Sequence, residues 1–265
     1  MAKLSASQLQ KTITSTIEEL ASLLDEAQFS QEIQAYLDTV AKFHHYSIYN
    51  QMLIHDLFPQ ASHVAGFCTW RDKFNRTVKK GEKGIPILAP ILVKEEPQEE
   101  GEEPKTKRFF KVVYVFDISQ TEGDPVPELD VWKSPEYRPE LHNILINYAV
   151  SLGLSVDQVE LGAAQGALSA NKKIYLDLTA GTKTLVHEIA HYLANHLERS
   201  ISHKQRELEA EAIAYVVCRH FGFEGLKSPN YLHLIGLKPE DLKASLITIS
   251  TLAQQIINQI EERIN

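Results

Sequence analysis

A helical segment with two histidines four residues apart places the strongest constraint on what this chain can fold into. The segment reads His187-Glu188-Ile189-Ala190-His191. An α-helix turns once in about 3.6 residues, so both histidines project from one face. Leu185, Val186 and Leu193 give the segment a broad apolar face, which predicts a helix packed in a core. Two imidazoles on one face can begin a zinc site with an open position for water, and Glu188 is placed to take a proton from that water.

Such a site needs a third protein ligand, and the next predicted helix, residues 204–221, offers three glutamates. The short connection at residues 199–202 predicts that the two helices run antiparallel. Glu207 and Glu211 share a face, whereas Glu209 points elsewhere and is expected to be solvated. Spacing alone does not separate the first two. We predict Glu207 as the ligand, with Glu211 behind it orienting a histidine ring; the alternative is an ordinary charged helix face.

The segments before this helix pair predict an α+β protein of two domains. Helical spacing covers residues 6–24, 29–56 and 140–152, and short strands are predicted at 63–70, 77–78, 85–93 and 109–117, then at 158–162 and 172–178. Residues 94–108 contain six Glu and read as a flexible acidic loop at a hairpin tip. We therefore divide the chain into a sheet-plus-helix domain at 1–124, a linker at 125–139 and a second domain at 140–265, which ends in a long helix at 239–264.

Charge is distributed unevenly along the first domain. The net charge of −8 argues against nucleic acid, yet residues 71–84 hold six basic residues against two acidic ones. Aromatic residues nearby can stack on bases while Lys and Arg follow phosphates, as in proteins that bind single strands. The alternative, which composition alone favours, is that Tyr46, Phe67 and Trp70 are core residues beside a solvated hairpin edge. Asn50 lies one turn from Tyr46 and can share its site or cap local backbone.

Several residues have competing interpretations. His44 and His45 are expected at a helix surface rather than at a metal. Gly166 precedes the predicted metal-binding helix, where it either lets an extended peptide approach a strand edge or simply forms a turn. The residue that stabilises an oxyanion stays open among five candidates: Tyr175, Tyr192, His196, Tyr215 and His220.

The two halves together resemble a known family. His187-Glu188-x-x-His191 followed by Glu207-x-x-Ala210-Glu211 resembles the gluzincin metallopeptidases, in which the first Glu of the second motif binds the metal. The strings Val-Lys-Lys-Gly-Glu-Lys-Gly at 78–84 and Phe-Asp-Ile-Ser-Gln-Thr-Glu-Gly at 116–123 resemble the ArdC antirestriction family, as do residues 46–51, 64–67 and Trp70. The resemblance extends from about residue 20 to residue 222.

The resemblance implies an N-terminal domain that binds single-stranded DNA and a C-terminal zincin-like metallopeptidase domain. The expected function is a zinc-dependent peptidase acting on a protein or peptide, coupled to sequence-nonspecific DNA binding in antirestriction, mobile-element transfer or phage defence. The residues expected to contact DNA are Tyr46, Asn50, Phe67, Trp70, Arg71, Arg76, Lys79, Lys80 and Lys83.

Two other functions stay open. One is a non-proteolytic DNA-coating antirestriction protein with a structural zinc; the presence of Glu188 weighs against it, since a structural site does not require that carboxylate. The other is a regulatory protease that cleaves a single protein partner; the basic hairpin weighs against it. Cys68 and Cys218 alone predict no disulfide framework, and no apolar run reaches the ~20 residues of a membrane span, so a cytoplasmic protein is expected. The oligomeric state is not predicted.

Overall fold

The computed structural model describes residues 4–23, 25–95, 105–126, 139–161, 165–224, 226 and 237–264 of the chain. Its contacts divide the chain into two compact units. Unit 1 consists of Met1–Thr16 and Tyr49–Pro127, and unit 2 consists of Ile17–Ile48 and Glu128–Asn265. Residues 96–104 of the predicted acidic loop and 127–138 of the predicted linker lie outside the described residues.

The units differ from the division made on the sequence, because residues 17–48 group with the C-terminal half. Helix α1 (Ala6–Ser22) crosses the boundary, and helix α2 (Glu26–Lys42) belongs entirely to unit 2. There α2 packs against helix α7 (His203–His220), with Phe29, Ile33 and Leu37 fully buried. An amphipathic helix joins whichever core covers its apolar stripe, and sequence order does not decide which core that is.

Unit 1 is built on an antiparallel sheet of order β1-β4-β3. Strands β3 (Ile85–Glu95) and β4 (Lys105–Asp117) pair along their length from Ile85↔Val115 to Glu95↔Lys105, which confirms the predicted hairpin. β1 is only Val64–Gly66, because the chain turns at Gly66 into helix α4 (Phe67–Phe74), where a longer strand was predicted. Helix α3 (Ile48–Leu57) precedes β1, and strands β2 (Arg76–Val78) and β5 (Thr121–Gly123) form a second small sheet.

The two family-like strings lie against each other in unit 1. Asp117 caps the short 3-10 turn η1 (Ile118–Gln120), and its carboxylate also accepts backbone N–H groups from Ser62 and His63 at 2.7 and 3.0 Å. The side-chain amide of Gln120 donates to the backbone carbonyl of Lys83 at 2.9 Å. These strings therefore fix the chain path around the sheet, since each satisfies backbone groups of another segment.

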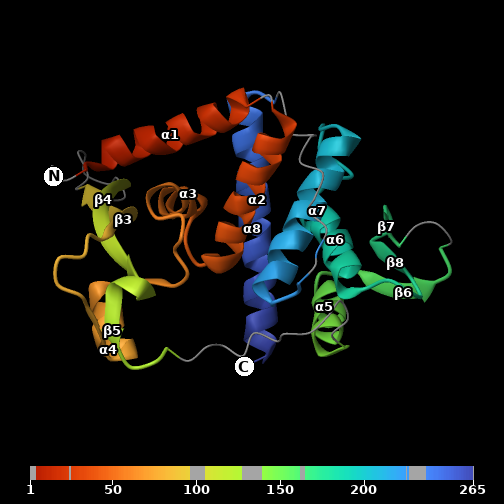
Figure 1. Ribbon diagram of the computed structural model, residues 1–265. Helices are drawn as coiled ribbons and strands as arrows, with labels where there is room; N and C mark the ends of the chain where they lie inside the picture. The colour runs from red at the N-terminus through yellow and green to blue at the C-terminus, as the bar shows by residue number, and fades with distance from the viewer. Residues whose placement is uncertain are drawn as a thin grey trace, which may run out of the picture. The chain divides into compact units, whose positions relative to one another are not determined.

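Unit 2 surrounds helix α7 (Figure 1). α7 packs against α2, helix α6 (Thr182–Leu193) and helix α8 (Pro239–Ile264), and it is buried from Leu208 to Cys218. Helix α5 (Pro139–Ser151) packs on α6 and α8. Predicted helices at 140–152 and 239–264 are thus confirmed.

A three-stranded sheet of order β6-β8-β7 completes unit 2. β6 (Ser155–Val159) runs parallel to β8 (Lys173–Asp177), whereas β7 (Gly166–Ser169) runs antiparallel to β8 and forms one edge of the sheet. β7 is also the strand in closest association with α6. None of the helices in the described ranges is long and apolar enough to cross a membrane.

Candidate metal centre

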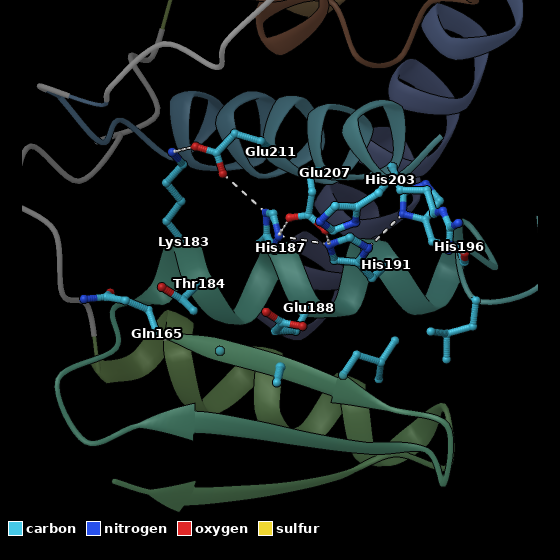
Figure 2. A pocket seen from close by; sticks show the side chains of 15 residues that line it. Gln165, Lys183, Thr184, His187, Glu188, His191, His196, His203, Glu207 and Glu211 are labelled. Carbon is cyan, nitrogen blue, oxygen red and sulfur yellow. Dashed lines mark hydrogen bonds and ion pairs between the residues drawn. The ribbon is translucent and has the colours of Figure 1, made fainter. Parts of the chain in front are cut away.

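The predicted metal-binding residues come from two helices that run in opposite directions (Figure 2). α6 carries His187, Glu188 and His191, and α7 carries Glu207 and Glu211 on the side that faces α6. The N-cap of α7 is Ser202, whose side chain accepts the backbone N–H of Gln205. The close approach of the two helices rests on Ala190 and Ala210, both fully buried.

Three side chains converge with the spacing that a tetrahedral ion requires. His187 Nε2 lies 3.0 Å from His191 Nε2, and Glu207 oxygens lie 3.5 and 3.4 Å from these two nitrogens. Zinc bonds of 2.0–2.1 Å at tetrahedral angles separate their ligand atoms by about 3.3 Å. The donor set therefore fits a zinc-like ion, with His187, His191 and Glu207 as its protein ligands.

Glu211 takes the position behind the ligands that the sequence predicted for it. One of its oxygens lies 3.3 Å from His187 Nδ1, and Lys183 pairs with the other. Burial lowers the pKa of His187, but Glu207 and Glu211 outweigh burial and raise the pKa to about 9. Hydrogen bonds from His187 and His191 hold the pKa of Glu207 well below its usual range. Two carboxylates thus concentrate negative charge on the point where a cation would sit.

Glu188 points away from α7 and toward strand β7 (Figure 2). The residue is only 5% exposed, and burial raises the pKa of its carboxyl group against the opposing effect of His187 and His191. A Cβ atom at Gly166 would come within 2.7 Å of Glu188 Oε1, so only glycine leaves room for the carboxylate there. Gly166 therefore lies in a strand rather than a turn, and its lack of a side chain allows β7 to lie in contact with the carboxylate of Glu188.

A chain of buried polar groups extends behind His191, and it corrects the expectation for Glu209. His196 Nδ1 lies 2.9 Å from His191 Nδ1, and His196 Nε2 lies 3.0 Å from Glu209. Glu209 is completely buried and also accepts bonds from Arg199 and from Ser245 of α8. Its solvation was predicted wrongly because α8 covers that face of α7.

The bonds in this chain assign the tautomers. Glu209 accepts, so the proton of a neutral His196 lies on Nε2, and its Nδ1 then accepts from Nδ1–H of His191. His191 Nε2 is left with a lone pair facing the centre. Supporting residues of this kind orient histidine ligands in metal sites. This role could not be predicted from residue spacing, since Ser245 and Glu209 are 36 residues apart.

A cavity of about 710 Å³ opens onto the centre. β7 supplies one wall through Gly166, Ala167 and Leu168, and His203 and Arg206 of α7 line it as well. Among the five oxyanion candidates only His196 lines the cavity, and it is bonded to His191 and Glu209. Tyr215 instead donates to Asp38 at 2.9 Å, and Tyr192 to the carbonyl of Leu152 at 3.3 Å.

Comparison with known proteins identifies the N-terminal part and the fold. Residues 5–116 match the family described as the N-terminal domain of anti-restriction factor ArdC. The metal-free crystal structure of the antirestriction protein ArdC from plasmid R388 matches with a TM-score of 0.54 at 19% identity, over 82% of this chain and 84% of that one. The chain has the fold of the R388 protein, and the family match covers its N-terminal part. The Mn(II)-bound structure of the R388 protein matches with a TM-score of 0.53 at 16% identity, over 95% of this chain and 96% of that one.

A Bacillus anthracis protein described as uncharacterized also resembles this chain. It is 26% identical over an alignment of 280 residues, which covers 85% of this chain. This chain spans about half of that relative's length, 47%.

Two residues of the ArdC N-terminal domain that were expected to contact DNA instead hold the fold together. Trp70 is 2% exposed, and its indole N–H donates to the backbone of Phe116 at 2.8 Å, so neither ring face is open to a base. Asn50 is 7% exposed and exchanges two hydrogen bonds of 2.9 Å with the backbone of Leu88. Both expectations are corrected: a buried amide or indole is retained where it satisfies backbone groups.

The other residues expected to contact DNA differ in how many contacts they already make within the protein. Arg76 bonds to Thr121 and to the backbone of Gly123 and Asp124, and Lys79 donates to the carbonyl of Ser119 at 2.9 Å. Arg71 is exposed and paired with Asp72. Lys80, Lys83 and Phe67 are exposed, the last at 48%. Tyr46 is half-buried and belongs to unit 2 rather than to unit 1.

The hairpin of the ArdC N-terminal domain exposes aromatic residues that sequence analysis assigned to the strand without a binding role. Phe109, Phe110 and Tyr114 of β4 are 51%, 41% and 39% exposed. Basic residues flank Phe109 and Phe110 on the same strand: Lys107, Arg108 and Lys111. A strand of apolar and aromatic residues reads as a core strand in the sequence, and only the structure shows that this end of the hairpin is uncovered.

Proposed function

We propose that unit 2 is a zinc-dependent metallopeptidase and that unit 1 binds single-stranded DNA without sequence preference. The observation that carries the first half is the convergence of His187, His191 and Glu207 at tetrahedral spacing, with a buried carboxylate, Glu188, on the next side of the same helix. The Mn(II)-bound structure of R388 ArdC supports a divalent ion, and two imidazoles with one carboxylate favour zinc.

The chemistry proposed is hydrolysis of a peptide bond. The bound metal would polarise the scissile carbonyl and lower the pKa of water toward ~7. Glu188 accepts the proton of the attacking water and delivers it to the leaving amine nitrogen. Burial raises the pKa of Glu188, which makes its carboxylate a stronger base for the first step.

β7 is the proposed binding edge for the substrate. It is the edge strand of its sheet, it lines the cavity, and it lies against Glu188. An extended peptide can add to such an edge through backbone hydrogen bonds, which place one carbonyl between the metal ligands and Glu188. Main-chain recognition of this kind requires an extended segment and tolerates varied side chains.

The proposed DNA surface of unit 1 consists of its exposed cations and aromatics: Phe67, Arg71, Lys80, Lys83, Phe109 and Phe110. Stacking and phosphate contacts together suit a single strand. R388 ArdC is an antirestriction protein, and we propose that this protein serves antirestriction or mobile-element transfer. Both cysteines are free, which fits a reducing cytoplasm.

A non-proteolytic antirestriction protein with a structural metal is the second candidate, because the family match covers residues 5–116 and does not include the metal centre. Glu188→Gln separates the two. The variant is expected to keep about one metal ion at this centre and to lose cleavage of a denatured, fluorescently labelled protein. Wild-type protein that holds metal yet shows no cleavage, with or without single-stranded DNA, would favour the structural role. Cleavage by one specific partner only would favour the regulatory protease.

DNA binding is tested separately with a labelled oligonucleotide. Lys80→Ala/Lys83→Ala is expected to weaken binding and to reduce its dependence on salt, because each phosphate contact releases a counterion. Lys11→Ala is the matched control, since Lys11 is an exposed lysine of the same unit on α1. Equal affinity of both variants would remove this surface as the DNA site.

A further inference from the structure

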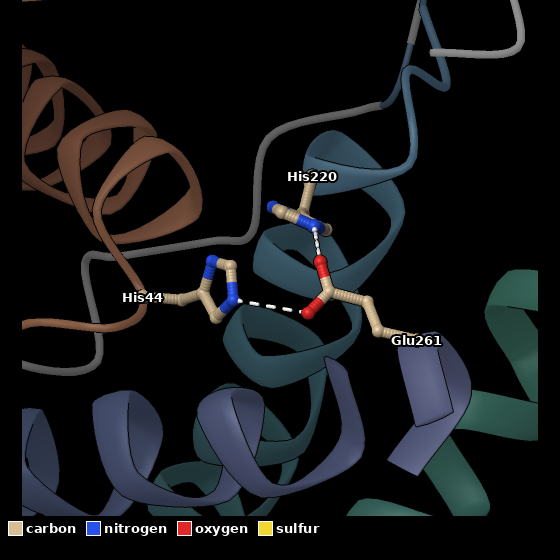
Figure 3. Close-up of side chains that lie close together, drawn as sticks. All are labelled: His44, His220 and Glu261. Carbon is tan, nitrogen blue, oxygen red and sulfur yellow. Dashed lines mark hydrogen bonds and ion pairs between the residues drawn. The ribbon is translucent and has the colours of Figure 1, made fainter. Parts of the chain in front are cut away.

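Three titratable side chains meet at the end of α7 remote from the first centre (Figure 3). His44 lies in the turn that follows α2, His220 is the last residue of α7, and Glu261 lies in the last turns of α8. All three belong to unit 2. His220 follows Glu207 by 13 positions, which is about 20 Å along a helix, so the cluster is separate from the first centre.

The three side chains point their donor atoms at one another. His220 Nε2 lies 3.0 Å from one oxygen of Glu261, and His44 Nε2 lies 3.5 Å from the other. One donor atom from each residue falls within 4.8 Å of the others. The His44 and His220 rings are 4.4 Å apart, edge to face. These spacings are those of the first centre, again with two imidazoles and one carboxylate.

The ring of His220 is held in the orientation of a ligand. Its Nδ1 lies 2.9 Å from the backbone carbonyl of Ala41, which can only accept, so Nδ1 carries the proton. In a neutral ring Nε2 then has its lone pair directed at the cluster. A backbone carbonyl that fixes the tautomer in this way is the usual support of a histidine metal ligand.

His44 supplies an independent observation. Its exposed fraction is 3%, and neither ring nitrogen has a hydrogen-bond partner among the described residues. The expectation of a surface position is wrong, because α2 ends at Lys42 and the chain turns inward there. A buried polar atom without a partner is destabilising, commonly by about 1–3 kcal/mol. Burial, followed by the neighbouring His220 and His45, lowers the pKa of His44 to about 4, so its ring is neutral at pH 7.

We propose that His44, His220 and Glu261 bind a second divalent metal ion of the zinc class. The ion ties the ends of α7 and α8 to the turn after α2. His220 and Glu261 are 15% and 29% exposed at their side chains, which leaves access for a water molecule as the fourth ligand. Among the described residues, the group that could hold this ion consists of these three side chains, and the role proposed for the site is structural. The competing arrangement is a metal-free cluster in which a doubly protonated His220 pairs with Glu261.

The test uses the full chain in a His187→Ala/His191→Ala background, which removes the first centre. Purified protein is loaded with zinc, passed through a desalting column and analysed for metal. Wild-type protein is expected to retain about two ions per chain and the background protein about one. Adding His44→Ala and His220→Ala to the background is expected to leave none.

Glu261→Gln in the same background is the sharper variant, because it keeps the shape of the side chain. It is expected to abolish retention, whereas Glu262→Gln is expected to retain the ion. Glu262 is the matched control: it is the next residue of α8, exposed and bonded to Gln259. Zinc at about 100-fold above its Kd is expected to raise the Tm of the background protein by roughly 5 °C or more, and to leave the Tm of the Glu261→Gln variant unchanged.

Cobalt gives a readout independent of stability. Co(II) in the background protein is expected to show the visible absorption of a four-coordinate site, absent from Glu261→Gln. A background protein that is folded by circular dichroism yet retains no zinc overturns the proposal. So does equal metal retention by Glu261→Gln and Glu262→Gln. Either result assigns the three residues to a metal-free polar cluster.

Discussion

Gly166→Ala tests the contact between strand β7 and Glu188. The φ angle of Gly166 is not in the left-handed region, so alanine fits the backbone there. Without a steric conflict, the substitution would stabilise the fold by about 0.4–1 kcal/mol, because it restricts the unfolded chain. The sign of the change in stability therefore reports whether the strand lies against the helix as the structure shows.

The contact distances predict destabilisation instead. The new Cβ would lie 2.7 Å from Glu188 Oε1 and 2.8 Å from Thr184 Cγ2. Ordinary contact begins at about 3.5 Å, so either the strand or the side chains must move by about 0.7 Å. Overpacking of this size costs about 1–3 kcal/mol. Because a displacement of about 1 Å can reduce a rate about 100-fold, the proposed cleavage is expected to fall while metal is retained.

Urea unfolding followed by far-UV circular dichroism measures the effect, and a double-mutant cycle assigns it. Thr184→Ser removes the Cγ2 atom that the new methyl group would meet, so it is expected to recover part of the lost stability when combined with Gly166→Ala. Glu188→Ala is expected to do the same from the other side. A Gly166→Ala protein as stable as wild type, or more stable, would refute the reasoning about this contact.

Four other predictions concern charge and buried polar groups. Zinc uptake at pH 7 is expected to release about one proton, since the pKa of His187 in the metal-free protein is about 9. Titration calorimetry in buffers of different ionisation enthalpy counts the released protons. Release of none would mean that the His187 ring is already neutral. Because the pKa of His187 is higher in the folded than in the unfolded protein, its protonation stabilises the metal-free fold, fully so below pH ~6.5. The urea midpoint should therefore fall as the pH rises through about 9. Glu209→Gln should lower the free energy of unfolding by roughly 3 kcal/mol, because Arg199 and His196 lose a buried partner. An unchanged free energy of unfolding would contradict the burial of Glu209. Asn50→Ala should lower the free energy of unfolding by about 2 kcal/mol and leave DNA affinity unchanged, since both hydrogen bonds of the Asn50 side chain go to the backbone of Leu88. Weaker DNA binding by a stably folded variant would show that Asn50 contacts DNA.

The local features of this fold were accessible to sequence analysis because each depends on residues close together in the chain. Spacing placed His187 and His191 on one helix face, and alternation with turn residues located the β3–β4 hairpin. Spacing did not separate Glu207 from Glu211. In the structure Glu207 oxygens lie 3.5 and 3.4 Å from the Nε2 atoms of His187 and His191, and a Glu211 oxygen lies 3.3 Å from Nδ1 of His187. The helix at 239–264 was equally clear from its apolar spacing.

The features that were missed depend on which element covers which face. Periodicity assigns Glu209 to the side of α7 away from Glu207, but whether that side meets water or α8 is decided by packing between distant segments. The exposure of Trp70 and of Phe109 was also predicted wrongly, in opposite directions, because it too depends on packing between distant segments. An aromatic residue in a basic segment is buried, and one in an apolar strand is 51% exposed.

The two histidine clusters show how this limit applies to α7. The first cluster could be predicted from the sequence because two of its histidines are four residues apart on α6. The second combines residues from two helices and the turn after α2, and His44 and His220 are 176 positions apart, so no spacing rule relates them. Yet both clusters use the same donor set, one toward each end of α7, the most buried helix of unit 2. Because α7 contacts every helix that contributes to either cluster, an ion at the C-terminal cluster would restrain the helix that presents Glu207 to the first centre. The Glu261→Gln variant should therefore leave zinc affinity at the first centre unchanged if α7 is already rigid through its packing, and should weaken it if the second ion contributes to holding α7 in place.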